Sequence, residues 1–178
     1  MPMGETINHS HEAPWGHPGI DFQWDNKASV LVAASGKVAE IVLLPHSQSQ
    51  DPDIVVHSVV VLTNEYMVLY EVTDLYSFNT DIAVGNNVTT GQTLGYALNI
   101  GFGYGWHMIH WAFGNYQKMD PPITTPEGET RNYSFSYLCP VPYFTDTERG
   151  RLFRIWESAS YEHKDKFPEV CNGLYKNY

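Results

Sequence analysis

Residues 54–73 read IVVHSVVVLTNEYMVLYEVT, and this stretch decides the fold class. Val, Ile, Leu and Tyr dominate it on both sides of a polar break at residues 63–65 (TNE). Side chains that are β-branched or aromatic lose freedom in a helix but pack well on a pleated surface. The pattern therefore predicts two strands joined by a turn.

Three further stretches have a similar composition. Residues 28–44 (ASVLVAASGKVAEIVLL) are two apolar runs that break at Ser35-Gly36. Residues 82–98 (IAVGNNVTTGQTLGYAL) alternate short apolar runs with Gly and Asn, and residues 106–113 (WHMIHWAF) are apolar and aromatic. Many short strands separated by turns predict a β-sandwich or a related mainly β fold.

The last third of the chain has a different pattern. Residues 120–126 (DPPITTP) are predicted to form a Pro-rich linker. Thr145 and Glu148 match a capping box, in which two side chains satisfy backbone N–H groups at a helix start. Apolar residues follow at helical spacing, so we expect one amphipathic helix near residues 146–163 that packs on the β domain. The expected segments are an N-terminal arm (1–14), a β domain (15–118) and a C-terminal extension (119–178).

Composition argues against two classes of partner. The 178 residues suit one domain with extensions, and the net charge is −10. Nucleic-acid binding needs clustered Lys and Arg, and the whole chain has 10 of them. No apolar run approaches the length of about 18 residues that a membrane helix requires. We therefore expect neither a nucleic-acid partner nor a membrane span.

The two cysteines, Cys139 and Cys171, both lie in the C-terminal third of the chain. A disulfide that fixes the tail and two buried thiols are both compatible with this placement. Cys-x-x-Cys spacing is absent, which argues against a zinc site built from cysteines.

Histidine and aspartate side chains in two segments offer metal ligands. Residues 16–22 (GHPGIDF) place His17 and Asp21 on either side of a Pro-Gly pair that permits a sharp bend, and a later strand carries His107 and His110. Zinc prefers a few N and O donors that converge on one point and leave one position open. Alone, His-x-x-x-Asp is a weak pattern, because a turn histidine and a backbone-capping aspartate give the same letters.

The order of these landmarks resembles the lysostaphin-type zinc endopeptidases, which cut peptide cross-links in bacterial cell walls. That family shows H-x-G-x-D-F near its start, then a Gly-x-Val turn, then V-x-x-G-x-x-V-x-x-G-x-x-I-G, and a closing strand with H-x-H-F. Residues 17–22 (HPGIDF), 32–38 (VAASGKV) and 83–95 (AVGNNVTTGQTLG) are similar to the first three. The resemblance covers about residues 15–114.

The resemblance implies an antiparallel β-sandwich of the lysostaphin type and one zinc ion held by His17, Asp21 and His110. It also implies a cell-wall peptide or polysaccharide as substrate, and a secreted or periplasmic location. Residues 1–13 are polar and lack the apolar middle of a signal peptide, so a cytoplasmic location stays open.

Two catalytic positions of the family differ here. The first histidine of H-x-H falls on Met108, which cannot transfer a proton. His107 is one place earlier, and on a regular strand it faces away from His110 unless a bulge re-aims it. The histidine of the family's Y-x-H falls on Val72 or on Tyr76, depending on the alignment. The candidate catalytic residues are therefore His107 and Tyr76.

Three functions fit this pattern. The first is a zinc hydrolase that cuts cell-wall peptides with a metal-bound water. The second is a zinc-dependent carbohydrate-active enzyme, similar to a lyase, in which Tyr76 is the acid or base. The third is a degenerate cell-wall binding or scaffold domain without catalysis.

Overall fold

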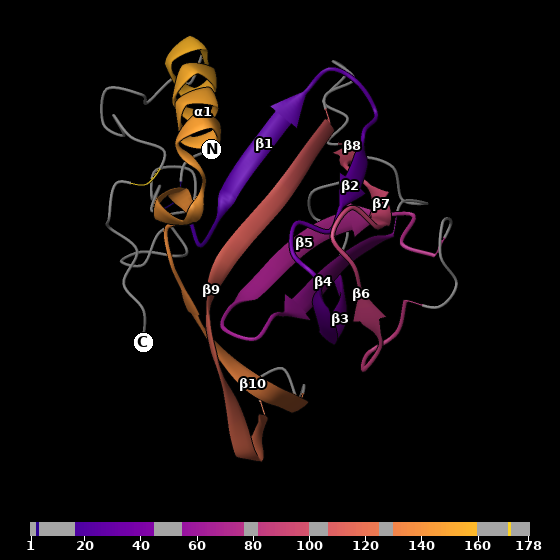
Figure 1. Cartoon of the computed structure of the whole chain (residues 1–178). Helices are drawn as coiled ribbons and strands as arrows, with labels where there is room; N and C mark the ends of the chain where they lie inside the picture. Colours follow the sequence, from indigo (N-terminus) through magenta and orange to yellow (C-terminus); the bar gives the residue numbers. More distant parts are fainter. Residues whose placement is uncertain are drawn as a thin grey trace.

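The computed structural model describes Met3, residues 17–44, 55–76, 82–99, 107–124 and 130–159, and Cys171. Within these parts the chain forms ten strands, one short 3-10 helix and one α-helix (Figure 1). All the strands belong to one hydrogen-bonded sheet that curls over on itself. The expected mainly β fold with antiparallel pairing and a C-terminal helix is confirmed.

Six strands run across the main sheet in the order β1-β9-β5-β4-β3-β6, with antiparallel neighbours throughout. Their bounds are β1 (Ile20–Trp24), β9 (His107–Thr124), β5 (Met67–Thr73), β4 (Val56–Leu62), β3 (Gly36–Leu44) and β6 (Asn87–Val88). The stretch that decides the fold class supplies β4 and β5. Between them Thr63 closes the turn, because its backbone N–H donates to the Tyr66 carbonyl over 2.8 Å.

Four shorter or peripheral strands complete the sheet: β2 (Ser29–Leu31), β7 (Thr93–Tyr96), β8 (Leu98–Asn99) and β10 (Thr130–Tyr137). β2 pairs with β7, and β8 and β10 pair with β9. Val30, Val88 and Leu94, from β2, β6 and β7, pack against buried side chains of β4, β5 and β9. The main core therefore lies between one face of the main sheet and the layer that folds over it (Figure 1).

Strict alternation along the strands separates this core face from the opposite face. On β5, Tyr70 and Val72 point into the core and are 1% and 0% exposed. The Tyr70 hydroxyl accepts a 2.8 Å hydrogen bond from the Ala33 N–H, which links the main sheet to the chain after β2. Leu69 precedes Tyr70, and Glu71 lies between Tyr70 and Val72. Both residues therefore lie on the opposite face.

The predicted linker at residues 120–126 is wrong for residues 120–124, which continue β9. Ile123 and Thr124 pair with β10, but the register then shifts between Arg131 and Tyr133. Proline cannot donate to a strand ladder, so it is tolerated where the ladder is interrupted. Pro121 and Pro122 lie within that irregular part. Residues 125 and 126 lie outside the described residues.

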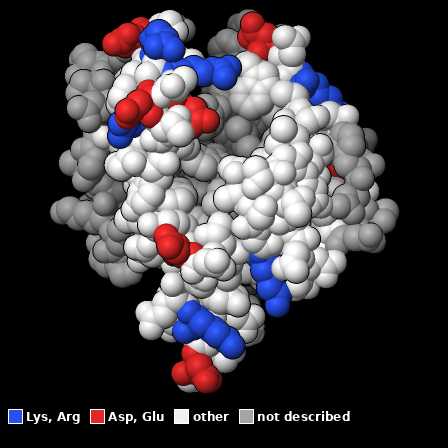
Figure 2. All heavy atoms as spheres, in the orientation of Figure 1, with Lys and Arg blue, Asp and Glu red and all other residues white. Residues whose placement is uncertain are grey.

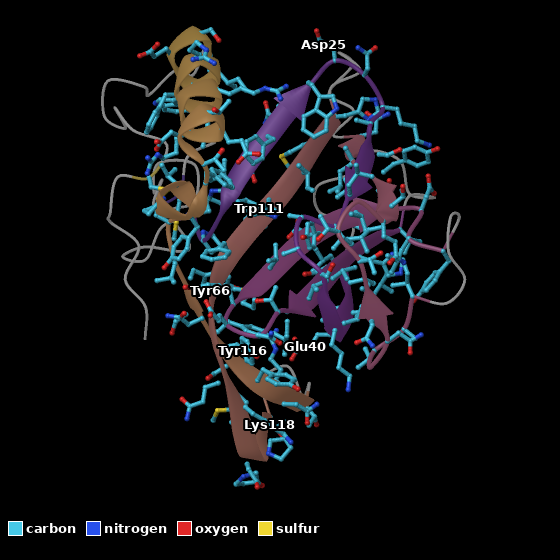
Figure 3. The ribbon with its side chains drawn as sticks, viewed as in Figure 1. Asp25, Glu40, Tyr66, Trp111, Tyr116 and Lys118 are labelled. Carbon is cyan, nitrogen blue, oxygen red and sulfur yellow. A yellow bond between two sulfur atoms is a disulfide. The ribbon has the colours of Figure 1, made fainter. Side chains whose placement is uncertain are left out.

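The long β9–β10 hairpin projects from the body of the molecule (Figure 1). The Tyr116 hydroxyl donates a 3.0 Å hydrogen bond to the Thr63 carbonyl, and this bond ties the hairpin to the β4–β5 turn (Figure 3). On the face drawn in Figure 2, charged side chains of both signs lie over the helix and at the hairpin end, and the described residues form no continuous basic patch there.

The α-helix α1 (Asp146–Ser158) begins as the sequence predicts. Thr145 and Glu148 form the complete capping box. The helix ends at Ser158 because Ala159 is extended, so the helix is shorter than expected; residues 160–163 lie outside the described residues. Among the described residues, no helix combines the length and hydropathy that a membrane crossing requires.

Helix α1 is held against the sheet by a second apolar cluster. Leu152 and Trp156 pack with Ile20 of β1 and with Met3. Of the two alternatives for the cysteines, the structure has the disulfide: Cys139 is joined to Cys171, with their Cα atoms 5.8 Å apart. Cys171 is therefore covalently fixed beside the helix. A short 3-10 helix, η2 (Val141–Tyr143), leads into α1.

Candidate metal centre

Three polar side chains, two of them from neighbouring strands, meet on the face opposite the core. His17 lies in the segment that leads into β1, Asp21 lies on β1, and His110 lies on β9. Asp21 and His110 are directly opposite each other in the β1–β9 ladder. The structure thus brings together the three residues that the sequence predicts as metal ligands.

The three donor atoms form a small triangle. His110 Nδ1 is 3.0 Å from His17 Nε2 and 3.0 Å from Asp21 Oδ1, and His17 Nε2 is 3.2 Å from Asp21 Oδ1. Each neutral imidazole carries one hydrogen, and an ionised carboxylate carries none. If both rings donate to Asp21, two N–H groups face each other along the third edge. Hydrogen bonds alone therefore leave one edge of the triangle unsatisfied or repulsive.

A shared cation satisfies all three edges, and the donor set fits zinc. Zinc binds imidazole nitrogen and carboxylate oxygen at about 2.0–2.2 Å in tetrahedral geometry, which separates neighbouring donors by roughly 3.3 Å. The measured separations of 3.0–3.2 Å are close to that spacing. Three protein donors leave a fourth tetrahedral position, as catalytic zinc sites do. The described residues hold this one group of three or more converging donors.

Burial and charge prepare these groups for a cation. His17 is 2% exposed and Asp21 9% exposed. Burial alone would raise the pKa of the Asp21 carboxyl, but hydrogen bonds and charge interactions with His110 and His17 outweigh it, so the pKa is lowered. Asp21 is therefore ionised at neutral pH. The His110 side chain is 12% exposed, which makes it the most accessible of the three groups.

Gly19 explains why the chain between the two N-terminal ligands can bend so closely against β9. A Cβ at this position would lie 2.5 Å from the Trp111 carbonyl oxygen and 2.9 Å from the His110 ring. Only glycine permits this approach. The Pro-Gly pair of the sequence motif is thus a packing requirement of the site.

Sequence reasoning missed one residue beside the site, Glu71 of β5. The β5–β9 ladder pairs Leu69 with Ala112 and Tyr70 with Trp111, so the next pair along it is Glu71 and His110. Burial raises the pKa of the Glu71 carboxyl, and the charges of His110, Asp21 and His17 act on the same group. No sequence motif marks this residue, because only the register between β5 and β9 brings it to the site.

The donor triangle includes neither of the two predicted catalytic residues, His107 and Tyr76. The β1–β9 register is regular from Trp111 to His107, so His107 shares the face of Ile109 and Trp111 rather than that of His110. Tyr76 is 50% exposed and packs edge-on against His57, with ring centroids 5.4 Å apart. Their catalytic roles stay predictions.

Met108 lies at the position that the sequence resemblance aligns with the first histidine of H-x-H. It lies on the same face of β9 as His110, two residues before it, and is 8% exposed. It packs with Val56 and Leu98 in a small apolar cluster, and the Gln23 amide is 3.9 Å from its sulfur. An apolar thioether therefore borders the site on this side.

Comparison with known proteins yields weak matches. No family model and no curated protein matches the chain. A crystal structure of cbpa from L. salivarius REN matches with 23% identity and a TM-score of 0.36, over 56% of each chain. Two structures of Helicobacter pylori Csd3 match with 17% and 14% identity and TM-scores of 0.39 and 0.41, over 87% and 94% of this chain.

The present chain spans about a third of the length of the Csd3 chains, 35% and 38%. TM-scores of 0.36–0.41 are too low to support an argument about function. The site is therefore interpreted from its own geometry.

Proposed function

We propose that the chain is a metal-dependent hydrolase that holds one zinc ion with His17, Asp21 and His110. The observation that carries this proposal is the triangle of donor atoms, 3.0–3.2 Å apart, in a buried setting. Hydrogen bonds do not satisfy this arrangement, whereas a divalent cation does. Two imidazoles and one carboxylate are also a known donor set of catalytic zinc sites.

Zinc bound at these donors supplies Lewis-acid activation of water and of a carbonyl group. The protein residues hold and orient the donors. Asp21 is ionised, and the lowered pKa that makes it so favours a bound cation. Gly19 brings the segment of His17 against β9, and His110, with a 12% exposed side chain, is the donor that solvent reaches most.

For the substrate, we propose a peptide or amide bond in the cell wall. The support is the order of sequence motifs shared with lysostaphin-type endopeptidases, from HPGIDF at residues 17–22 to the strand that carries His110. A location outside the cytoplasm agrees with the Cys139–Cys171 disulfide, since such bonds persist in oxidising compartments.

A metal-binding domain without catalysis is the second candidate. The observation that favours it is Met108, because a thioether lies where the family has a proton-transferring histidine. Such a domain would bind zinc and cell-wall material and release no product.

The first test is the metal content of the purified protein by elemental analysis. We expect about one zinc per chain in the wild type, as three donors define one site. His110→Ala removes a donor and should lose the metal. His107→Ala is the matched control, since it deletes a histidine from the opposite face of the same strand. Absence of zinc from the wild type, or retention of zinc in His110→Ala, would contradict the proposed metal site.

The second test is release of primary amine from purified bacterial peptidoglycan. The hydrolase proposal predicts release by the wild type and none by His110→Ala. If His107→Ala still releases amine, His107 is not required for catalysis. Zinc binding without amine release would favour the second candidate.

A further inference from the structure

A row of polar side chains crosses four strands of the sheet and includes the candidate metal ligands. Asp21 of β1 lies opposite His110 of β9, and the continuing register places Glu71 of β5 on the other side of His110. Ser58 of β4 lies opposite Glu71 and is 8% exposed. The metal site therefore has a second carboxylate on its β5 side, which the three-ligand description does not use.

Glu71 lies beside the ligands and is not one of them. The donor atoms that lie within 4.8 Å of one another come from His17, Asp21 and His110, and Glu71 is outside this group. Residues directly opposite in a sheet have Cβ atoms about 5 Å apart, and a glutamate extends further than an aspartate. Its carboxylate can therefore contact what is bound at the open side of the site.

The surroundings of Glu71 contain no cationic partner of the usual kind. Among the described residues, no lysine or arginine forms an ion pair with it. Burying part of a carboxyl group costs stability, and the charged groups that act on Glu71 are His110, Asp21 and His17, so its place beside the two imidazoles calls for a role. His107 lies on the opposite face of β9 from His110.

We infer that Glu71 is the proton acceptor of the metal centre. The inference rests on the proposed hydrolase function and names its general base. A water molecule adds to the scissile carbonyl carbon while one of its protons passes to a carboxylate oxygen of Glu71. The C–N bond then breaks, and Glu71 returns the proton to the leaving nitrogen. The products are a carboxylic acid and an amine, so atoms and charge balance.

The test compares Glu71→Gln with the wild type. Glutamine keeps the size of the side chain and removes its ability to accept a proton. Glu71→Asp keeps the carboxylate and should recover part of the activity. Glu65→Gln, in the exposed β4–β5 turn, removes the same charge far from the ligands and is the matched control. His110→Ala marks the effect of losing a ligand.

Two measurements are independent of turnover. Zinc affinity, from competition with a chromogenic chelator, should stay within about tenfold of wild type in Glu71→Gln, whereas loss of a direct ligand should cost more than 100-fold. The visible absorption of the cobalt(II)-substituted protein should change with pH in the wild type. Glu71→Gln should shift the midpoint of that change, because the proton acceptor beside the metal has been removed.

Amine release from peptidoglycan is the third measurement. It should fall by about 10²–10⁴-fold in Glu71→Gln, as expected for loss of a general base. Glu65→Gln should match the wild type in all three assays.

The outcomes separate this inference from the proposed function. If the wild type binds zinc and releases amine, but Glu71→Gln leaves the rate and the cobalt midpoint unchanged, the inference is wrong and the hydrolase stands. If Glu71→Gln loses zinc as His110→Ala does, Glu71 is a ligand and not the base. If the wild type binds no zinc, the proposed function fails, and the role of Glu71 fails with it.

Discussion

The two faces of the main sheet differ in chemistry although the same strands form both. Tyr70 and Trp111 point into an apolar core, whereas their sequence neighbours Glu71 and His110 lie with Asp21 in a polar row. Because strand side chains alternate, a shift of one residue in register would exchange the two faces. The apolar face thus fixes the register that aligns the donors on the other face.

The largest expected effect comes from a substitution on the core face of β9, at Phe113. Phe113 is 8% exposed and packs on Tyr66 and Tyr143, with ring centroids 4.9 and 4.7 Å away. Phe113→Ala should lower the free energy of unfolding by about 3–5 kcal/mol, since it leaves a cavity in the core. Zinc stoichiometry of the folded protein should not change. Urea unfolding and elemental analysis measure the two quantities.

His110→Ala should give the opposite result on the same strand. It should abolish zinc binding and change the stability of the metal-free protein far less than Phe113→Ala does. If Phe113→Ala and His110→Ala lost zinc binding and stability to the same extent, the two faces of the sheet would not have independent roles.

Removal of metal should affect only the polar face. A ligand present at about 100 times its dissociation constant stabilises a fold by about 2.7 kcal/mol. A chelator should therefore lower the unfolding temperature of the zinc-loaded wild type, as measured by calorimetry. His110→Ala supplies the control, and an identical shift in that variant would point to chelator effects unrelated to the site.

A smaller effect is expected at Gly19, where the segment that carries His17 packs against β9. Gly19→Ala would bring a Cβ within 2.5 Å of the Trp111 carbonyl, so it should cost about 1–3 kcal/mol of stability and weaken zinc binding. In Gly150→Ala, within α1, the new Cβ meets only an Arg154 nitrogen at 3.4 Å. That control should not destabilise the fold, and equal effects of the two substitutions would contradict the role assigned to Gly19.

The smallest effect concerns the hydroxyl group of Tyr70, which lies on the core face. Tyr70→Phe removes the hydrogen bond from the Ala33 N–H and should cost about 1 kcal/mol near pH 8. Burial raises the pKa of Tyr70, so its neutral form stabilises the fold below pH of about 10, and this contribution is lost as pH rises further.

Urea unfolding at pH 8 and above pH 10 provides the measurement for Tyr70→Phe. Wild type should lose more stability than Tyr70→Phe between the two pH values, because phenylalanine does not titrate. The other tyrosines titrate in both proteins, so the difference isolates Tyr70. The same pH dependence of stability in the two proteins would contradict the role assigned to the Tyr70 hydroxyl.

Much of the fold followed from local pattern. The Val- and Tyr-rich runs predicted β4 and β5, and the capping box at Thr145 predicted the start of α1. The linker prediction was wrong for residues 120–124 because Pro121 and Pro122 lie in an irregular part of a strand ladder, and proline composition alone does not distinguish a linker from such a strand.

Local sequence accounts for the alternation of the strands and the spacing of His17 and Asp21, since these depend on side chains a few residues apart. The place of Glu71 beside His110, and that of His107 on the opposite face, became visible only in the folded chain. Both placements depend on strand register. Which residues of β1, β5 and β9 lie opposite one another depends on packing between strands far apart in the chain, and no local pattern encodes that pairing.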